Sequence, residues 1–124
     1  MTTRRALVAV IDDDQSVRES LPDLLVEFGF ATRAFASAEE FLASPDLPAT
    51  ECAILDVAMR GMSGPDLQRE LRTLRPQLPV IFITARRDER LRSQMLEHGA
   101  VAYLFKPFSD TSLLDALHAA LPDC

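Results

Sequence analysis

The sequence predicts an α/β domain in which a doubly wound, parallel sheet of five strands carries helices on both faces. Short apolar runs recur along the chain, and amphipathic segments of helical period separate them. Runs of this kind suit strands that are buried on both sides, and their alternation with helices indicates crossovers between parallel strands. With 124 residues, 48% of them hydrophobic, the chain has the size and composition of one globular domain over residues 1–124.

Residues 6–11 form the first apolar run and predict a strand, because the run is too short for a helix. Residues 15–28 predict an amphipathic helix that Gly29 ends. The apolar stripe of this helix comprises Val17, Leu21, Leu24, Leu25 and Phe28. Pro22 lies inside the helix, where it removes a backbone hydrogen bond and predicts a kink between about Arg18 and Pro22.

The second strand is predicted at residues 30–35, where apolar and polar side chains alternate. Ser37 and Glu40 then form a capping box, the side-chain pattern that opens a helix. Pro45 and Pro48 end this short helix and predict a loop before the next strand.

Residues 52–55 predict a third strand that ends at Asp56, and residues 79–83 predict a fourth that ends at Thr84. The segment between them, residues 64–75, begins with Gly-Pro and predicts a helix. We expect its apolar stripe to face the core through Leu67, Leu71 and Leu74.

The remaining segments complete the alternation. A helix over residues 89–98 is closed by Gly99, and a fifth strand covers residues 102–105. A last helix runs from Asp110, its expected N-cap, to Leu121. Because crossovers between parallel strands are right-handed, the flavodoxin-like strand order 2-1-3-4-5 is the simplest topology.

Polar side chains follow the strands at the points where the strands end. Asp12 and Asp13 follow the first strand, Asp56 the third, Thr84 the fourth and Lys106 the fifth. The carboxyl ends of parallel strands meet at one edge of a sheet, where ligands bind. Lys106 is the only lysine beside twelve arginines, which suits a compact charge aimed at a small anion. Three carboxylates with open positions predict a site for Mg²⁺.

Four segments together carry a family resemblance. They are Val-Ile-Asp-Asp-Asp at residues 10–14, Leu-Asp-Val-Ala-Met-Arg-Gly-Met-Ser-Gly at 55–64, Thr-Ala at 84–85 and Lys-Pro-Phe at 106–108. In this order and spacing, the chain resembles the receiver domain of bacterial two-component response regulators. With Gly-Ala-Val-Ala-Tyr at 99–103, it is most similar to receivers of nitrogen-fixation and nitrate-response transcription factors.

The resemblance implies a phosphorelay function with Mg²⁺ as cofactor. Asp56 is implied as the phosphoacceptor, which takes a phosphoryl group from a sensor histidine kinase. Asp13 and Asp56 are implied as direct Mg²⁺ ligands, the Ala58 carbonyl as a third, and Asp12 as a ligand through water. By the same resemblance, the domain catalyses only its own phosphorylation and dephosphorylation, and is otherwise not an enzyme.

The resemblance also implies a conformational switch. Thr84 would hydrogen-bond one phosphoryl oxygen, and Lys106 would pair with another. Tyr103 stands at the family's rotamer-switch position and would turn inward when phosphorylation draws Thr84 toward the phosphoryl group. The alternative is a static core tyrosine with a solvated hydroxyl. The peptide bond before Pro107 is expected to be cis.

Three residues depart from the family pattern. Arg60 replaces the usual proline, which predicts a more mobile loop after Asp56. Ala58 offers the phosphoryl group no side chain. For Arg86, two residues past Thr84, the hypothesis is a side chain that folds over the site and slows hydrolysis; the alternative is a solvated arginine.

Composition excludes several other functions. A net charge of −6 argues against nucleic-acid binding by this domain, and no run is apolar and long enough to span a membrane. The first residues, 1–5, show no export signal. Cys52 and Cys124 do not form a disulfide framework, so we expect a cytoplasmic protein. A homodimer through helix 89–98, strand 102–105 and the last helix is possible, with Arg90 and Arg92 available for contacts.

Two alternative functions stay open at this point. A pseudo-receiver would use the same fold as a phosphate-independent interaction module. A phosphohydrolase of the haloacid-dehalogenase type also places Asp, Thr and Lys at strand ends, and Asp12-x-Asp14 imitates its nucleophile motif. That family needs a further acidic motif after its lysine, which this chain lacks, and it would phosphorylate Asp12 instead of Asp56. Asp14 is expected to cap the first helix.

Overall fold

The chain folds around a five-stranded parallel sheet with the strand order β2-β1-β3-β4-β5. The structure, a computed structural model, describes residues 5–122. Cys124 lies outside the described residues, and so do residues 1–4 of the N-terminal segment in which no export signal was found. The predicted fold class and strand order are confirmed. Strands and helices alternate along the chain without exception in the described range.

The observed bounds lie within about one residue of those predicted. The strands are β1 (Leu7–Ile11), β2 (Ala31–Phe35), β3 (Cys52–Asp56), β4 (Val80–Thr84) and β5 (Ala102–Phe105). The helices are α1 (Gln15–Glu27), α2 (Ala38–Leu42), α3 (Gly64–Leu74), α4 (Glu89–Glu97) and α5 (Asp110–Ala120). The loop predicted at Pro45 and Pro48 contains one short 3₁₀ turn, Leu47–Ala49.

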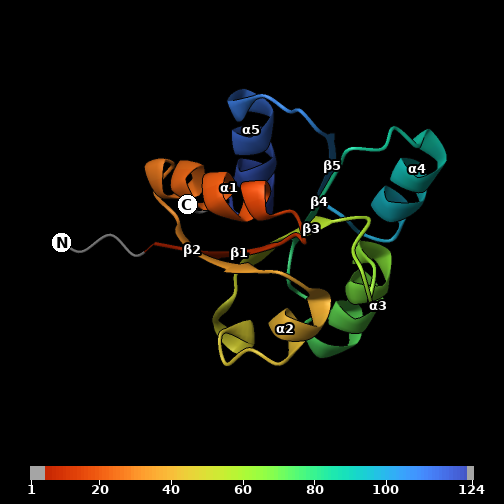
Figure 1. Cartoon of the computed structure of the whole chain (residues 1–124), viewed down its shortest axis with the longest axis horizontal. Helices are drawn as coiled ribbons and strands as arrows, with labels where there is room; N and C mark the ends of the chain where they lie inside the picture. Colours follow the sequence, from red (N-terminus) through yellow and green to blue (C-terminus); the bar gives the residue numbers. More distant parts are fainter. Residues whose placement is uncertain (1–4, 123–124) are drawn as a thin grey trace.

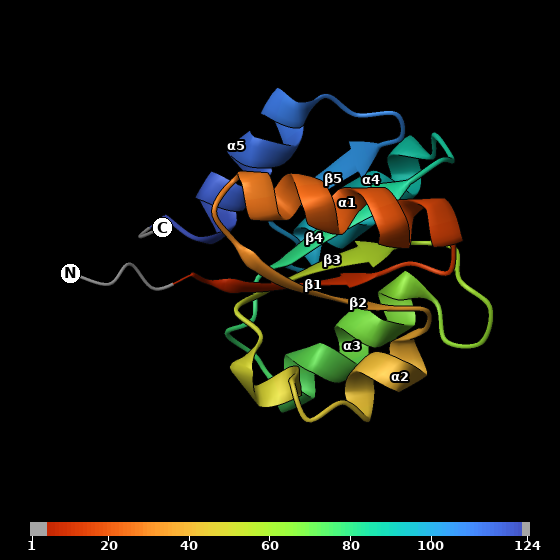
Figure 2. The ribbon, with the colours of Figure 1, turned by 60° about the vertical axis from the view of Figure 1, so that its left-hand side comes forward.

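The helices form two layers with the sheet between them (Figures 1 and 2). Helices α1 and α5 lie together on one face, and α2 and α3 cover the other. Alternate residues of β1 separate the two cores: Val8 and Val10 pack with α1 and α5, whereas Ala9 and Ile11 pack with the opposite layer. Met95 of α4 joins the core of α2 and α3. Burial on both sides explains why the strands are continuous apolar runs.

Helix starts follow the expected capping chemistry with one correction. Asp14 caps α1, since its carboxylate accepts a hydrogen bond from the Ser16 N–H at 2.9 Å. Ser37 caps α2 by accepting from the Glu40 N–H. The prediction that Asp110 caps α5 is wrong: the cap is Ser109, and Asp110 is the first helical residue, where a carboxylate favours the helix dipole.

Leu74 was expected in the core and is instead 53% exposed. Leu74 is the last residue of α3, whereas Leu71 of the same turn is buried in the core, so only the final position of the helix lies outside the packed face. Leu78, four residues further on, is buried at the same end of the core. Pro22, where the sequence predicts a kink, lies inside α1, and the helix continues through it from Gln15 to Glu27.

Candidate functional site

The carboxyl edge of the sheet brings three carboxylates together. Asp12 and Asp13 follow β1, and Asp56 is the last residue of β3. One oxygen atom of each lies within 4.8 Å of the others. Asp12 is completely buried, and Asp56 is 6% exposed. The predicted acidic cluster is therefore present, with Asp13 on its more open side.

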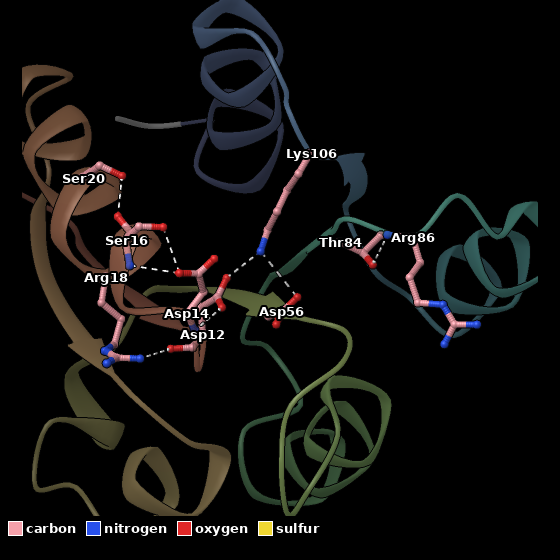
Figure 3. A network of polar contacts seen from close by, with 9 residues as sticks. All are labelled: Asp12, Asp14, Ser16, Arg18, Ser20, Asp56, Thr84, Arg86 and Lys106. Atoms are coloured by element: carbon pink, nitrogen blue, oxygen red, sulfur yellow. Dashed lines mark hydrogen bonds and ion pairs between the residues drawn. The ribbon is translucent and has the colours of Figure 1, made fainter.

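Lys106, the residue after β5, supplies the cation of this cluster. Its Nζ lies 2.9 Å from Asp12 Oδ2 and 3.7 Å from Asp56 Oδ1 (Figure 3). The second oxygen of Asp12 accepts a hydrogen bond from the Asp14 N–H at 2.9 Å. Both oxygens of Asp12 are thus engaged by protein groups. The backbone of the lysine is also tied to β4, because the Lys106 N–H donates a hydrogen bond to the Thr84 carbonyl at 2.7 Å.

Proton affinities in the cluster reflect burial and crowding. Burial, followed by the negative charge of Asp12, raises the pKa of Asp56 to about 7, although Lys106 acts in the opposite direction. Burial lowers the pKa of Lys106, but its hydrogen bond with Asp12 and the charge of Asp56 outweigh this and leave the pKa raised. The lysine therefore stays charged, while Asp56 holds a proton easily unless another cation approaches.

Arg60 contacts Asp13, a role that the sequence analysis missed. Its backbone N–H donates to Asp13 Oδ2 at 3.1 Å, and its Nε lies 3.8 Å from the same oxygen. The side chain of Arg60 is 92% exposed, so the backbone bond is the better defined of the two contacts. The signal in the sequence was the absence of proline, because proline has no N–H to donate.

The loop from Asp56 to α3 is restrained by contacts near the end of β3 and with α2. Gly64 N–H donates to the Val57 carbonyl at 2.9 Å, and a Cβ at Gly64 would clash with the Asp56 carbonyl oxygen. Only glycine therefore permits this approach of α3 to the end of β3. Glu39 of α2 accepts from the Met62 N–H at 3.0 Å. The greater mobility predicted for this loop stays a prediction. These contacts restrain the loop and so argue against it.

Thr84 ends β4 and is 1% exposed. Its Oγ1 accepts a hydrogen bond from the Arg86 N–H at 3.1 Å. The side chain of Arg86 is exposed and extends away from Asp56 in Figure 3. This arrangement corresponds to the solvated alternative for Arg86, and its effect on hydrolysis stays a prediction.

Tyr103 of β5 lies inside the protein. It is 6% exposed and packs against Phe82 and Phe105, with ring centroids at 5.9 and 5.6 Å. Its hydroxyl is buried and has no hydrogen-bond partner in the described part of the chain. The alternative with a solvated hydroxyl is therefore wrong for this structure. Arg87 stacks over the Phe105 ring at 4.9 Å and covers the neighbouring surface.

The donor set fits a hard divalent cation. The three carboxylates offer only oxygen, and Asp13 and Asp56 retain accessible coordination positions. Ala58 lies exposed on the same loop, two residues past Asp56, and its carbonyl as a ligand stays a prediction. The peptide bond between Lys106 and Pro107 is cis, as expected.

Comparison with known proteins identifies the class that this fold and site define. Residues 8–118 match the model of the response regulator receiver domain. The chain belongs to this family, whose members are the receiver modules of two-component systems.

Individual relatives agree with the family. The chain is 44% identical over 116 residues to nodulation protein W of Bradyrhizobium diazoefficiens, covering 94% of this chain and 51% of the relative. It is 40% identical over 121 residues to the response regulator protein TodT of Pseudomonas putida, covering 98% and 53%. The chain spans about half the length of the curated relatives it matches.

A solved structure gives the same result. The crystal structure of FixJ-N is similar to this chain with a TM-score of 0.85 at 34% identity, and the match covers 98% of both chains. The transcriptional regulatory protein FixJ of Rhizobium meliloti is 38% identical over 114 residues, covering 91% of this chain and 55% of the relative. The expected similarity to nitrogen-fixation regulators is confirmed. Within residues 5–122, no helix is long and apolar enough to cross a membrane.

Proposed function

We propose that this domain takes a phosphoryl group from a phosphohistidine of a sensor histidine kinase onto the carboxylate of Asp56, with Mg²⁺ as cofactor. The observation that carries the proposal is the convergence of three carboxylates within 4.8 Å, with the Lys106 ammonium beside two of them. Phosphoryl transfer needs a positioned oxygen nucleophile and neutralised charge more than covalent help from the protein.

Asp56 is the acceptor because its carboxylate oxygens take part in fewer hydrogen bonds than those of Asp12. Asp12 is fully buried, and both of its oxygens accept hydrogen bonds. Asp56 faces the lysine at 3.7 Å, beyond hydrogen-bond distance. This difference favours the receiver function over the haloacid-dehalogenase alternative, in which Asp12 would be the nucleophile.

The nucleophile must be ionised to attack phosphorus. In the protein alone, burial and the neighbouring carboxylates raise the pKa of Asp56 to about 7. Mg²⁺, when bound, supplies positive charge that offsets this cluster and the phosphoryl oxygens. Asp13, Asp56 and the Ala58 carbonyl would hold it, with Asp12 acting through water. Lys106 would then be free to exchange its bond with Asp12 for one with a phosphoryl oxygen.

Thr84 and Tyr103 form the proposed switch. The Thr84 hydroxyl would leave the Arg86 N–H to donate to a phosphoryl oxygen, and this movement would alter the space beside Tyr103. Since Tyr103 already lies inward, phosphorylation would stabilise the inward ring over an outward population. The domain would catalyse only its own phosphorylation and dephosphorylation.

The relatives suggest what the switch would control. They are about twice as long as this chain and include transcriptional regulators, so an output domain or a separate partner is the expected target. A homodimer through α4, β5 and α5 is one route, and a groove of about 460 Å³ lies on that face beside Tyr103 and Arg92. The domain's net charge of −6 supports a protein partner over nucleic acid.

The test is phosphate incorporation from acetyl phosphate with Mg²⁺, comparing the wild type with Asp56→Asn. We expect the wild type to be labelled, the variant to be unlabelled, and a chelator to abolish the reaction. Asp23→Asn on the exposed face of α1 is the matched control and should be labelled like the wild type.

Other outcomes would point elsewhere. Labelling of Asp56→Asn would identify another acceptor, with Asp12 the first to examine. An unlabelled wild type that still binds Mg²⁺ and is not phosphorylated by a histidine kinase would favour the pseudo-receiver alternative.

A further inference from the structure

Two adjoining cavities lie between α3 and α4, and neither is part of the acidic cluster. The larger has a volume of about 240 Å³ and the smaller about 140 Å³. Both are lined by the same three polar residues, Gln68, Arg72 and His98. We call the two cavities together the α3–α4 cleft. It runs from Pro65, at the start of α3, to Gly99, after the end of α4.

Gln68 is the feature that separates this cleft from an ordinary surface groove. The residue is 4% exposed, and its side-chain amide makes no hydrogen bond within the described residues. The amide is not among the fully buried groups that lack a partner, so it reaches the water of the two cavities and can donate to a ligand there. Since Gln68 lines both cavities, a ligand in the cleft could satisfy it.

The charge of the cleft is opposite to that of the protein. The chain carries a net charge of −6, but no carboxylate lines either cavity among the described residues. Arg69 is paired with Asp66 at 3.2 Å, and Arg75 donates to backbone carbonyls. Arg72 has no ion pair or hydrogen bond in the described range, so its guanidinium is available.

The larger cavity also has an apolar part, and Arg69 and Gln94 complete its lining. Leu91 and Met95 of α4 and Pro65 of α3 line it, beside the polar residues. A cavity of about 150 Å³ is large enough for benzene, so about 240 Å³ admits a ring and a substituent. An apolar body would contact these side chains while its charged group reached Arg72.

We propose that the α3–α4 cleft binds a small organic phosphate monoester. The phosphoryl oxygens would accept hydrogen bonds from the Arg72 guanidinium, the Gln68 amide and the His98 ring, and the organic group would fill the larger cavity. A planar guanidinium matches phosphate geometry with two parallel bonds, and an amide N–H adds a directed donor. The cleft is thus a second anion site, independent of Lys106.

The test is an amide chemical-shift titration of the isotope-labelled chain without Mg²⁺. The probes are phenyl phosphate, inorganic phosphate and phenol, which separate the contributions of the charge and the ring. We expect saturable shifts on α3 and α4 with phenyl phosphate, and affinity at least about fivefold higher than for inorganic phosphate or phenol. Arg72→Ala and Gln68→Leu should each weaken binding about tenfold.

Arg90→Ala is the matched control, since Arg90 is an exposed arginine of α4 that lines neither cavity. It should bind phenyl phosphate like the wild type, and the melting temperature of each variant would confirm its fold. Unchanged affinity in Arg72→Ala, shifts confined to Thr84 and Lys106, or no saturation at about 10 mM phenyl phosphate would each overturn the proposal.

Discussion

The carboxyl edge of the sheet has two halves that are held in different ways. In the first, around Asp12, Asp56 and Lys106, charged groups contact one another at 2.9 to 3.7 Å. In the second, around Thr84 and Tyr103, there is one backbone-to-hydroxyl bond and a buried hydroxyl without a partner in the described residues. Figure 3 shows the corresponding polar networks, and no dashed line joins them.

The difference indicates a division of work. Charge pairing fixes the first half tightly, as required of groups that must meet a metal ion and a phosphoryl group in one geometry. The polar side chains of the second half make fewer contacts, so the Thr84 hydroxyl can change partners at low cost. A phosphoryl group on Asp56 would connect the two halves, because Lys106 and Thr84 could then contact the same group.

Removing the cation of the charged half should change stability more than any other substitution considered. Lys106→Met leaves the buried Asp12 and Asp56 without their partner, and removal of one member of a buried pair costs about 3 kcal/mol. We expect this loss in urea unfolding at pH 8 without Mg²⁺. The double variant with Asp56→Asn should recover much of it. Unaltered stability of Lys106→Met would mean that the pair contributes little.

The next effect is the pH dependence of stability without metal. The pKa of Asp56 is raised to about 7, so the folded protein holds a proton that the unfolded chain releases near pH 4. This contribution to stability is complete below pH 4 and is lost as pH rises to about 7. Since Lys106 and solvent moderate the shift, we expect a difference of about 2 kcal/mol.

Asp56→Asn removes the titrating group and is the control for that pH profile. Its stability should vary less than the wild type's between about pH 4 and 7, and it should be the more stable of the two at pH 8. Parallel profiles for the two proteins would assign the pH dependence to another group.

A smaller effect is expected at Arg60, where one backbone bond reaches Asp13. Arg60→Ala removes a nearby cation but keeps the N–H, so Mg²⁺ should bind about threefold more tightly by calorimetry. Arg60→Pro removes both, and the less restrained Asp13 should lower the affinity about threefold relative to Arg60→Ala. Equal affinities for the two variants would show that the N–H has no role.

The smallest effect is expected in the second half. Tyr103→Phe removes a buried hydroxyl without a partner, so the free energy of unfolding should stay equal or rise by up to about 1 kcal/mol. Thr32→Val, which removes the other buried hydroxyl of this kind, is the matched control. A clear loss of stability in Tyr103→Phe alone would reveal a hydrogen bond made in solution.

Much of the fold was predictable because its signals are local. Apolar runs and helical periodicity placed the five strands and the four longer helices of the described range within about one residue, as Cys52–Asp56 and Glu89–Glu97 illustrate. The same alternation predicted that the three aspartates and Lys106 share one edge. Errors occurred where two neighbours compete for a role, as Ser109 and Asp110 do at a cap, or at the last residue of a helix, as at Leu74.

Other features depend on residues far apart in the chain. The contact of Arg60 with Asp13 spans 47 positions, and that of Lys106 with Asp12 spans 94. The approach of Gly64 to the Asp56 backbone and the position of Gln68 in the α3–α4 cleft likewise have no local signature. Pattern analysis cannot supply such distances, because they result from how whole layers pack.

The order of strands and helices, the parallel sheet and the set of charged residues at its carboxyl edge can all be read from the amino-acid sequence. These follow from side-chain periodicity and from the chirality of crossovers, which act over short stretches. The packed molecule was needed to show which carboxylate pairs with Lys106, that Tyr103 lies inward, and that a cationic cleft lies between α3 and α4. Each of these depends on close packing between distant segments, where shifts of about 1 Å make or break a contact.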